Sequence, residues 1–288
     1  MKIALASCSN LPDWEVDDQP LFHALNELGI QSASPSWDDS TVDWSAFDGC
    51  LIRTTWDYTA KPKAFVAWAK MVSTCTQLYN PPDIVEWNLN KYYLHELSSK
   101  GVSIAPTEWI FDSVDLRKVM SKRGWEKAFL KPIVGASAEN TLRFDFSDLD
   151  LAHQLLDKVL PQCGMMLQPY LQRVETEGEY SLIYFDNKIS HCVRKVPVKG
   201  DYRVQDDYGA KDYREDPPES LLALGRQTMN VIGRSLLYAR VDALRGDDGE
   251  WFLNELELIE PSLFFRHCDK SAGVLANALC KQIESGGA

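Results

Sequence analysis

Two apolar segments joined by a short turn near the C-terminus most constrain how this chain can fold. Residues 236–245 (LLYARVDALR) and 251–259 (WFLNELELI) are rich in Val, Leu, Tyr and Phe, which predicts a strand in each. The Gly-Asp-Asp-Gly sequence at 246–249 is typical of a hairpin turn. We therefore expect the two strands to pair antiparallel within one sheet.

Both predicted strands carry charges at alternate positions. Arg240 and Asp242 project to one side of the first strand. Glu255 and Glu257 share a side of the second, and an antiparallel hairpin can bring the two sides onto one face. If that face is buried, its charges need a divalent cation, an anionic ligand or both. Oxygen ligands without His or Cys favour Mg²⁺ or Mn²⁺ over zinc. A solvent-facing strand pair with hydrated charges explains the hairpin alone equally well.

The charge balance of the whole chain limits its partners. Among 288 residues, 42 are acidic and 30 are basic, which gives a formal net charge of −12. This balance argues against binding to nucleic acid or anionic membranes, which requires basic patches. The N-terminal MKIALASCSN has too short an apolar run for a signal peptide, and no segment approaches the roughly 20 apolar residues of a membrane span. We expect a cytoplasmic protein with a small-molecule substrate, and the composition permits a homo-oligomer.

The cysteines and histidines argue against a zinc site or a disulfide framework. The seven cysteines are scattered and never form C-x-x-C, and the five histidines show neither H-x-x-x-H nor H-E-x-x-H spacing. Buried, reduced thiols are the simplest interpretation.

Strands alternate with helices in the first part of the chain. Residues 2–8 and 48–53 predict strands, and 19–29 and 62–73 predict helices that each begin near a proline. This alternation favours a small parallel α/β lobe, with ligands at its strand ends. Further along, the patterns predict helices at 89–100, 148–160, 221–235 and 272–284, and strands at 102–110, 127–131, 141–146, 165–171, 179–185 and 188–197.

Several residues suit a nucleotide although the usual glycine motifs are absent. The sequence contains neither G-x-x-x-x-G-K-[ST] nor G-x-G-x-x-G, which disfavours a P-loop or Rossmann site. Lys131 ends a predicted strand directly before a small-residue loop, Val134 to Ala138, whose amides could cradle phosphate oxygens. Lys91 lies in the predicted helix 89–100, before Lys131, and Glu179 begins the predicted strand 179–185, after it. Taken singly, each has an ordinary structural explanation as a snorkelling lysine, a turn or a solvated acid.

The order of these pieces carries more information than any one of them. It resembles the ATP-grasp superfamily, in its glutathione-synthetase-like branch, over about residues 85–265. The matching pieces are Lys91, Lys131-Pro, Gly135-Ala-Ser137, Gln168-Pro-Tyr-Leu171, Gly178-Glu179, Arg240-Val-Asp242, Asn254-Glu255-Leu-Glu257 and Pro261. Three segments are also similar to the O-ureido-D-serine cyclo-ligase group of D-cycloserine biosynthesis: Arg53-Thr-Thr-Trp-Asp-Tyr58, Val193-Arg-Lys-Val-Pro197 and Glu255-Leu-Glu-Leu-Ile-Glu-Pro261.

The resemblance implies an α/β (α+β) fold of the ATP-grasp kind. Residues 1–85 would form the N-terminal α/β domain, and subdomains 86–170 and 171–288 would enclose ATP. The lysines and the small-residue loop would bind phosphates, the segment 168–171 would hold adenine, and Glu179 would accept from the ribose. The implied ATP ligands are Lys91, Lys131, Gly135, Ala136, Ser137, Gln168, Pro169, Tyr170, Leu171 and Glu179.

The implied metal ligands are Asp242, Glu255 and Glu257, which would hold Mg²⁺ or Mn²⁺. Two positions depart from the common family pattern. Glu257 stands where many members have Asn, and Gln168 stands where an acidic residue is frequent. The first departure changes the charge at the metal, and the second changes the contact to the adenine amine.

The resemblance further implies a ligase that phosphorylates a carboxylate or ureido group of a small amino-acid-like substrate and then forms a C–N bond, in an amide or a ring. Arg240 and Arg194 are the candidate catalytic residues, stabilising developing charge. The residues Arg53, Trp56, Asp57 and Tyr58 suit a small zwitterion, with Arg53 for its carboxylate and Asp57 for its ammonium. Packing between lobes is the alternative role for the two aromatic rings.

Residues 200–219 are dense in charge, Gly and Pro, which predicts a long loop. We interpret it either as a lid that carries Arg203 and Lys211 or as an acidic surface loop. Two other functions stay open: a nucleotide-binding regulatory or scaffold protein without ligase activity, and a metal-dependent phosphotransferase or hydrolase on another fold. ADP release with candidate substrates excludes the first. A thermal shift caused by Mg²⁺ and unchanged by ATP would favour the second.

Overall fold

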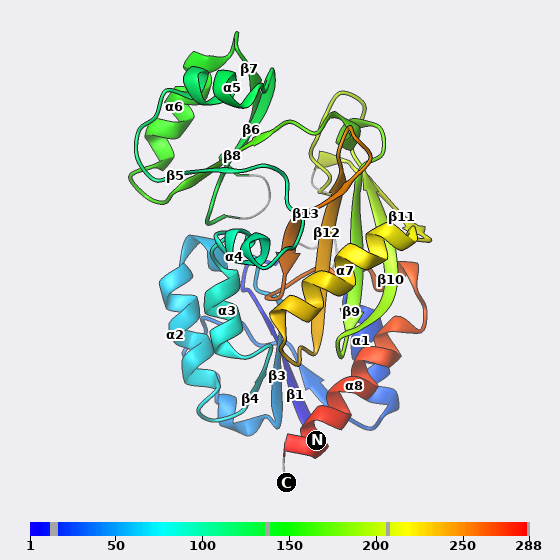
Figure 1. Ribbon diagram of the computed structural model, residues 1–288. Helices are drawn as coiled ribbons and strands as arrows, with labels where there is room; N and C mark the ends of the chain where they lie inside the picture. The colour runs from blue at the N-terminus through cyan, green and yellow to red at the C-terminus, as the bar shows by residue number, and fades with distance from the viewer. Residues whose placement is uncertain (12–16, 136–138, 206–207, 287–288) are drawn as a thin grey trace.

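The computed structural model describes residues 1–11, 17–135, 139–205 and 208–286. Its strands form three sheets that follow one another along the sequence and occupy three different parts of the molecule (Figure 1). In these ranges we find no helix with the length and apolar character needed to cross a membrane. The fold is mixed α/β, as the sequence predicts.

The N-terminal sheet is parallel and has the strand order β2-β1-β3-β4, which confirms the predicted α/β lobe. Buried residues three or four positions apart, such as Leu21 and Leu25, give its helices one apolar face toward the sheet. Its elements are β1 (Lys2–Ser7), α1 (Gln19–Glu27), β2 (Gln31–Ala33), η1 (Trp44–Ala46), β3 (Gly49–Thr54), η2 (Tyr58–Ala60), α2 (Pro62–Val72), β4 (Gln77–Tyr79) and α3 (Pro82–Asn88).

The middle sheet is antiparallel, with the order β5-β8-β6-β7. Leu130 packs with its helices in one apolar cluster, so the next residue of that strand, Lys131, faces the other side. The elements of this part are α4 (Tyr93–Ser99), β5 (Glu108–Ile110), α5 (Leu116–Arg123), β6 (Lys127–Pro132), β7 (Leu142–Asp145), α6 (Leu149–Val159) and β8 (Met165–Pro169).

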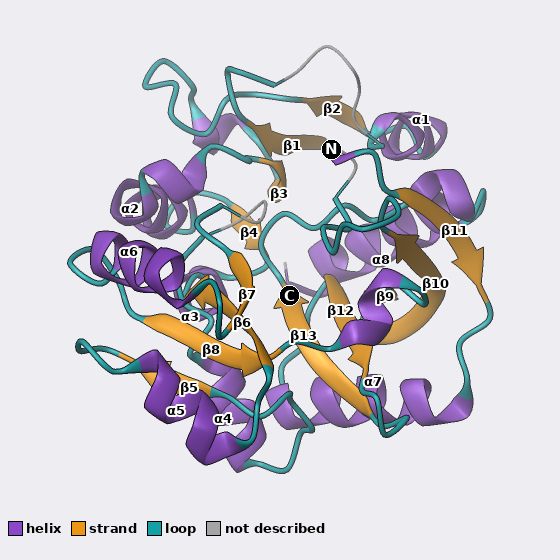
Figure 2. Cartoon of the chain, turned by 90° about the horizontal axis from the view of Figure 1, so that it is seen from above, coloured by secondary structure: helices purple, strands orange, loops and turns teal. Residues whose placement is uncertain are grey.

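The third sheet is antiparallel, with the order β11-β10-β9-β12-β13. Successive residues of its central strand belong to different cores. Leu182 packs with α7, whereas Ile183 packs with α8 and the N-terminal lobe. The helices α7 and α8 lie on opposite faces of this sheet (Figure 2). The elements are η3 (Gln172–Glu175), β9 (Glu179–Phe185), β10 (Lys188–Val196), β11 (Lys211–Glu215), α7 (Glu219–Ile232), β12 (Tyr238–Arg245), β13 (Trp251–Glu257), η5 (Phe265–His267) and α8 (Ser271–Gly286).

Each sheet lies within one of the three predicted segments, but one apolar core joins the first and last of them. Leu5 and Leu25 pack in the same cluster as Phe185 and Leu275. The three-domain division at 85 and 170 therefore stays a prediction, since these two parts share buried surface.

Three differences from the sequence expectations concern short or polar elements. The helix α5 was not predicted, and α3 begins at Pro82, where the sequence suggested only a break. The segment 200–219 is not wholly a loop, because β11 lies inside it and Lys211 begins that strand. Strands as polar as β11 lack an apolar alternation, and pairing with β10 at the sheet edge stabilises this one.

The free edge of β13 is saturated by side chains of α3 and α4. Asn88 donates from Nδ2 to the Leu256 carbonyl at 2.8 Å and accepts from the Leu258 amide at 2.8 Å. The Tyr93 hydroxyl accepts from the Leu256 amide, also at 2.8 Å. These side chains make the hydrogen bonds that a further strand would make here. They therefore fix the position of β13 and of the acidic residues on it.

We expect Asn88→Ala to lower the free energy of unfolding by about 2–4 kcal/mol, because it leaves two buried backbone groups of the strand unpaired. Urea denaturation followed by circular dichroism measures the loss. Asn277→Ala is the matched control: it removes one exposed hydrogen bond, to the Gly273 carbonyl. Equal stability of the two variants would contradict this account of the edge.

Candidate active site

A cavity of about 650 Å³ lies where the three sheets meet. All three contribute side chains to it, so no single part of the chain forms the site. From the N-terminal lobe come Arg53, Trp56 and Tyr58; from the middle sheet Lys131 and Gln168; from the third sheet Glu179, Lys195, Arg240, Asp242, Asn254, Glu255 and Glu257.

The hairpin at the centre of the site has the predicted geometry. Arg240 pairs in register with Glu257, and Asp242 pairs with Glu255, which confirms that the charges share one face. A register shift follows Asp242, and it leaves Asn254 as an extra residue in β13. This bulge turns Asn254 and Glu255 to the cavity together, although adjacent residues of a regular strand face opposite sides.

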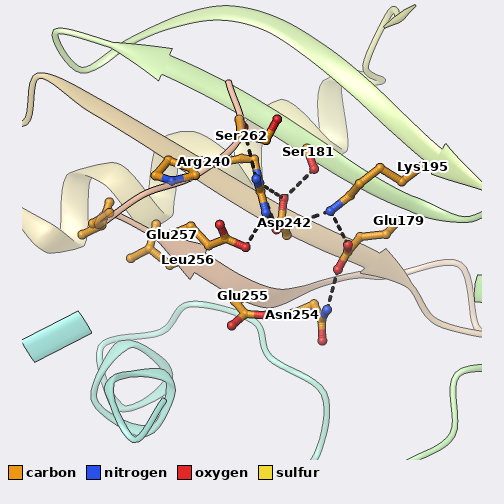
Figure 3. A network of polar contacts seen from close by, with 12 residues as sticks. Glu179, Ser181, Lys195, Arg240, Asp242, Asn254, Glu255, Leu256, Glu257 and Ser262 are labelled. Carbon is orange, nitrogen blue, oxygen red and sulfur yellow. Dashed lines mark hydrogen bonds and ion pairs between the residues drawn. The ribbon is translucent and has the colours of Figure 1, made fainter. Parts of the chain in front are cut away.

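Arg240 and Asp242 form the core of a buried polar network (Figure 3). The guanidinium donates from Nε to Oδ1 and from Nη2 to Oδ2 of Asp242, each at 3.0 Å, and also pairs with Glu257. Ser181 donates to Asp242 Oδ1 at 2.5 Å, and Lys195 Nζ lies 3.6 Å from Oδ2. Burial would raise the pKa of Asp242, but Arg240 and Lys195 outweigh it and lower that pKa to about 2. Asp242 is therefore ionised throughout the neutral range.

Lys195, rather than Arg194, faces this network. Its Nζ lies 2.6 Å from Glu179, whereas Arg194 pairs with Glu215 at 2.8 Å and lies outside the described cavity lining. The catalytic role of Arg194 stays a prediction that this arrangement does not support. Adjacent strand residues face opposite sides, and the pairing of Lys195 in register with Glu179 decides which of the two faces the site. Gly178 makes the pairing possible, since a Cβ there would lie 2.1 Å from the Lys195 carbonyl oxygen.

Two more lysines meet the acids from the opposite wall. Lys91 Nζ lies 2.7 Å from Glu255 and donates to the Gly135 carbonyl at 2.6 Å. Lys131 is buried and donates to Asn254 Oδ1 at 3.2 Å. Burial lowers the pKa of Lys131, and Lys91 lowers it further, while Glu255 opposes the shift. This side of the cavity therefore holds concentrated positive charge, as a phosphate site requires.

The segment expected to hold adenine begins at the end of β8 and lines the cavity. Gln168 is buried and donates from Nε2 to the Thr107 hydroxyl at 2.8 Å. The residues Pro169, Tyr170 and Leu171 lie along the same wall. Gly135 also lines the cavity, whereas Ala136 and Ser137 lie outside the described residues.

Residues 202–205, which we call the strap, cross from the third sheet to the middle sheet. The Tyr202 ring packs edge-on against Phe129, 5.2 Å between centroids, and Val204 belongs to the same small apolar cluster. Arg203 lines the cavity and is held by Asp201 at 2.6 Å. Lys211 is exposed on β11 and is not among the described lining residues, so only the first of the two predicted lid residues borders the site.

On the N-terminal wall, three of the four predicted substrate residues border the cavity. They are Arg53, Trp56 and Tyr58. Asp57 does not face it: its Oδ1 accepts the indole N–H of Trp37 at 2.7 Å. This arrangement does not support Asp57 as the ammonium ligand, because its carboxylate is engaged inside the lobe. Glu260, to which the sequence analysis gave no role, lines the cavity.

The predicted metal ligands do not form a ready cluster. Among the described residues, no three acidic, His or Cys side chains converge on one point. Asp242 is held by Arg240, Glu255 by Lys91 and Glu257 by Arg240. Burial nevertheless raises the pKa of Glu257 to about 8, with Asp242, Glu255 and Glu260 adding to the shift against Arg240. The carboxylate oxygens of Asp242, Glu255 and Glu257 are hard donors of the kind that Mg²⁺ and Mn²⁺ prefer, and all three residues line the cavity, so they fit a divalent cation.

The raised pKa of Glu257 predicts a pH dependence. A carboxyl group whose folded pKa exceeds its unfolded value stabilises the fold when protonated, so this contribution is present at low pH and is lost as pH rises through about 8. We expect the thermal stability of the ligand-free protein to fall between about pH 5 and pH 8, and Glu257→Gln to flatten that slope. Calorimetry across this range measures it, and an unchanged slope in the variant would refute the assignment.

Comparisons with known proteins agree with this geometry. Residues 3–80 match the family model of the N-terminal domain of the D-cycloserine synthetase DcsG. The cycloserine biosynthesis protein DcsG of Streptomyces lavendulae is 30% identical over 283 residues, 94% of this chain and 95% of that protein. A crystal structure of D-cycloserine synthetase DcsG superposes with a TM-score of 0.89 at 28% identity, covering 98% of this chain and all of that one. The ATP-grasp ligase PsnB, complexed with Mg and ADP, has a TM-score of 0.69 at 16% identity over 98% of both chains.

The fold and the site define an ATP-grasp enzyme, an ATP-dependent ligase that forms carbon–nitrogen bonds. Within the class, this chain belongs to the DcsG family.

Proposed function

We propose that this protein phosphorylates a carboxylate or ureido group of a small amino-acid-like substrate with Mg²⁺ and ATP, and then closes a C–N bond as a cyclo-ligase related to D-cycloserine synthetase. The observation that carries the proposal is the paired register of Arg240 with Glu257 and of Asp242 with Glu255, on the wall that faces Lys91 and Lys131. This arrangement supports the proposal, because oxygens suited to a divalent cation lie opposite cations suited to phosphate.

In this proposal, each wall of the cavity binds a different part of the nucleotide. Lys91 and Lys131 bind the phosphates, and Gly135 contributes backbone close to them. The segment from Gln168 to Leu171 borders adenine, and Glu179 accepts from the ribose hydroxyls. Lys195 lies between Glu179 and Asp242 and adds a third cation for the phosphates, which the sequence reasoning did not assign.

Asp242, Glu255 and Glu257 are the residues that would hold Mg²⁺ or Mn²⁺. When bound, such an ion would supply charge neutralisation at the phosphates. The present pairing of Glu255 with Lys91 is consistent with this, because the lysine that would bind phosphate now compensates the carboxylate.

The chain's own contribution is electrostatic. An oxygen of the substrate attacks the γ-phosphorus, the bond to the β-γ bridging oxygen breaks, and ADP leaves. A nitrogen nucleophile then displaces phosphate from the activated carbon. Arg240, fixed by Asp242 and by the Ser262 carbonyl at 3.1 Å, stabilises the charge in both steps without reorganising. The strap excludes water that would hydrolyse the activated substrate.

A phosphate-release screen tests the proposal. Purified protein with ATP and Mg²⁺ is offered amino acids, dipeptides and O-ureidoserine, and the products are identified by mass spectrometry. We expect substrate-dependent ADP formation with O-ureidoserine or a close relative, together with a product that has lost water or a carbamoyl fragment. Measurable ATP binding without turnover of any compound would reject the ligase function.

A further inference from the structure

One arginine on the N-terminal wall has an unsatisfied donor pointing into the buried site. Arg53 is only 3% exposed, and it donates from Nε and Nη2 to Asp18 at 3.1 and 2.9 Å. Nη2 also donates to the Pro261 carbonyl at 3.0 Å. Its Nη1 is buried and has no hydrogen-bond partner among the described residues. Buried guanidinium donors are rarely left unpaired, so this atom is available for an acceptor that the described residues do not supply.

A carboxylate lies beside that arginine. Glu260 precedes Pro261, whose carbonyl is bonded to Arg53, and the charges of Glu260 and Arg53 interact directly. The buried Tyr58 hydroxyl donates to Glu260 and fixes it. Within the described residues Glu260 has no ion pair. The neighbouring cations are already engaged: Arg53 with Asp18, and Arg240 with Asp242 and Glu257.

In the part of the chain that the structure describes, this wall therefore presents one donor without a partner, Arg53 Nη1, and one carboxylate without an ion pair, Glu260, and both residues border the cavity. An α-amino acid carries an ammonium and a carboxylate on the same carbon. A site that binds both therefore needs an anionic and a cationic group close together. We propose that Glu260, oriented by Tyr58, binds the ammonium of an α-amino acid substrate, and that Arg53 Nη1 donates to an oxygen of the same head group. This inference rests on the proposed ligase function and deepens it, since it assigns the substrate class and the residues that select it.

The assignment replaces the one that the sequence favoured. Asp57 stands only four residues from Arg53, but its carboxylate accepts from Trp37 and does not reach the cavity. Variants of Asp57 and Glu260 can therefore be compared directly. Only the change at Glu260 should weaken binding of the ammonium.

Direct binding tests this without turnover. Isothermal titration calorimetry, with protein saturated by the non-hydrolysable analogue AMP-PNP and Mg²⁺, measures a panel of D- and L-amino acids, O-ureidoserine, and 3-(ureidooxy)propanoic acid, which lacks only the ammonium. We expect Glu260→Gln to weaken ammonium-bearing probes about 10- to 100-fold, the effect of losing a charged hydrogen bond, and to leave the des-amino probe unchanged. Asp57→Asn should change neither. Tyr58→Phe should weaken the ammonium-bearing probes by a smaller factor.

Each other outcome is decisive. Equal binding of O-ureidoserine and its des-amino analogue by the unaltered protein would overturn the inference, as would an equal loss in the Glu260 and Asp57 variants. Failure of every amino-acid probe to bind AMP-PNP-loaded protein would also overturn it, and would leave the ATP-dependent ligase class in place. Failure to bind AMP-PNP at all would instead count against the proposed function.

Discussion

Replacing Arg240 by methionine should lower the rate of ADP formation about 10²- to 10³-fold, the usual effect of removing a preorganised charge-stabilising donor. The guanidinium is held by Asp242 and by the Ser262 carbonyl, so it is already oriented before substrate binds. Because the same change leaves Glu257 without its cation and Asp242 with Lys195 alone, stability should also fall by about 3–5 kcal/mol. Rates are therefore compared at temperatures where circular dichroism shows the variant folded.

Two companion variants separate catalysis from folding. Arg240→Lys keeps the charge but loses the bidentate geometry, so it should recover much of the stability and only part of the rate. Arg245→Met removes an arginine from the same strand, where it donates to the Gly249 carbonyl and lies 3.7 Å from Glu177. It should retain near-normal activity. If the Arg240 and Arg245 variants lost the same factor in rate, Arg240 would have no special role.

Lys131→Met should weaken AMP-PNP binding about 10- to 100-fold, because a buried lysine is well placed for a charged hydrogen bond to phosphate. The same change should stabilise the ligand-free protein, on the order of 1 kcal/mol, since the charged amine is buried beside Lys91. The pKa of Lys131 is lowered in the folded state. The unfolded chain therefore binds this proton more tightly, and the stability of the unaltered protein rises with pH through the lowered pKa.

Lys127→Met is the matched control, since Lys127 begins the same strand and is exposed. It should alter neither nucleotide affinity nor melting temperature. Fluorescence titration and differential scanning calorimetry give both quantities on the same samples. A Lys131 variant that binds AMP-PNP normally, or that melts at a lower temperature than the unaltered protein, would refute the assignment of this lysine to the phosphates.

Local patterns predicted the regular elements well because each depends on neighbours in the sequence. The alternation in 236–245 and 251–259 gave both strands of the hairpin and their shared charged face. Short or polar elements escaped prediction. β11 has no apolar alternation and exists because β10 offers it a partner, and α5 carries four basic residues among its eight.

Residue-level errors in the site have the same origin. Arg194 and Lys195 are adjacent and equally plausible in the sequence, and only the pairing of β10 with β9 decides which one faces Asp242. Asn254 carried no predicted role, and only the bulge shows that it faces the cavity together with Glu255. Asp57 is near Arg53 along the chain but is engaged by Trp37, whereas Glu260 is distant in the sequence and borders the same cavity as Arg53.

The sequence by itself determined that this chain carries a charged antiparallel hairpin, two separated lysines and a small-residue loop in the order of an ATP-grasp enzyme. These are properties of spacing and local periodicity, which the chain encodes directly. The tertiary structure alone decided which charges meet, because a bulge, an edge strand and a contact between Arg53 and the Pro261 carbonyl bring together residues as many as 208 positions apart. Electrostatic pairing depends on distance in space, and a sequence specifies that distance only through the complete fold.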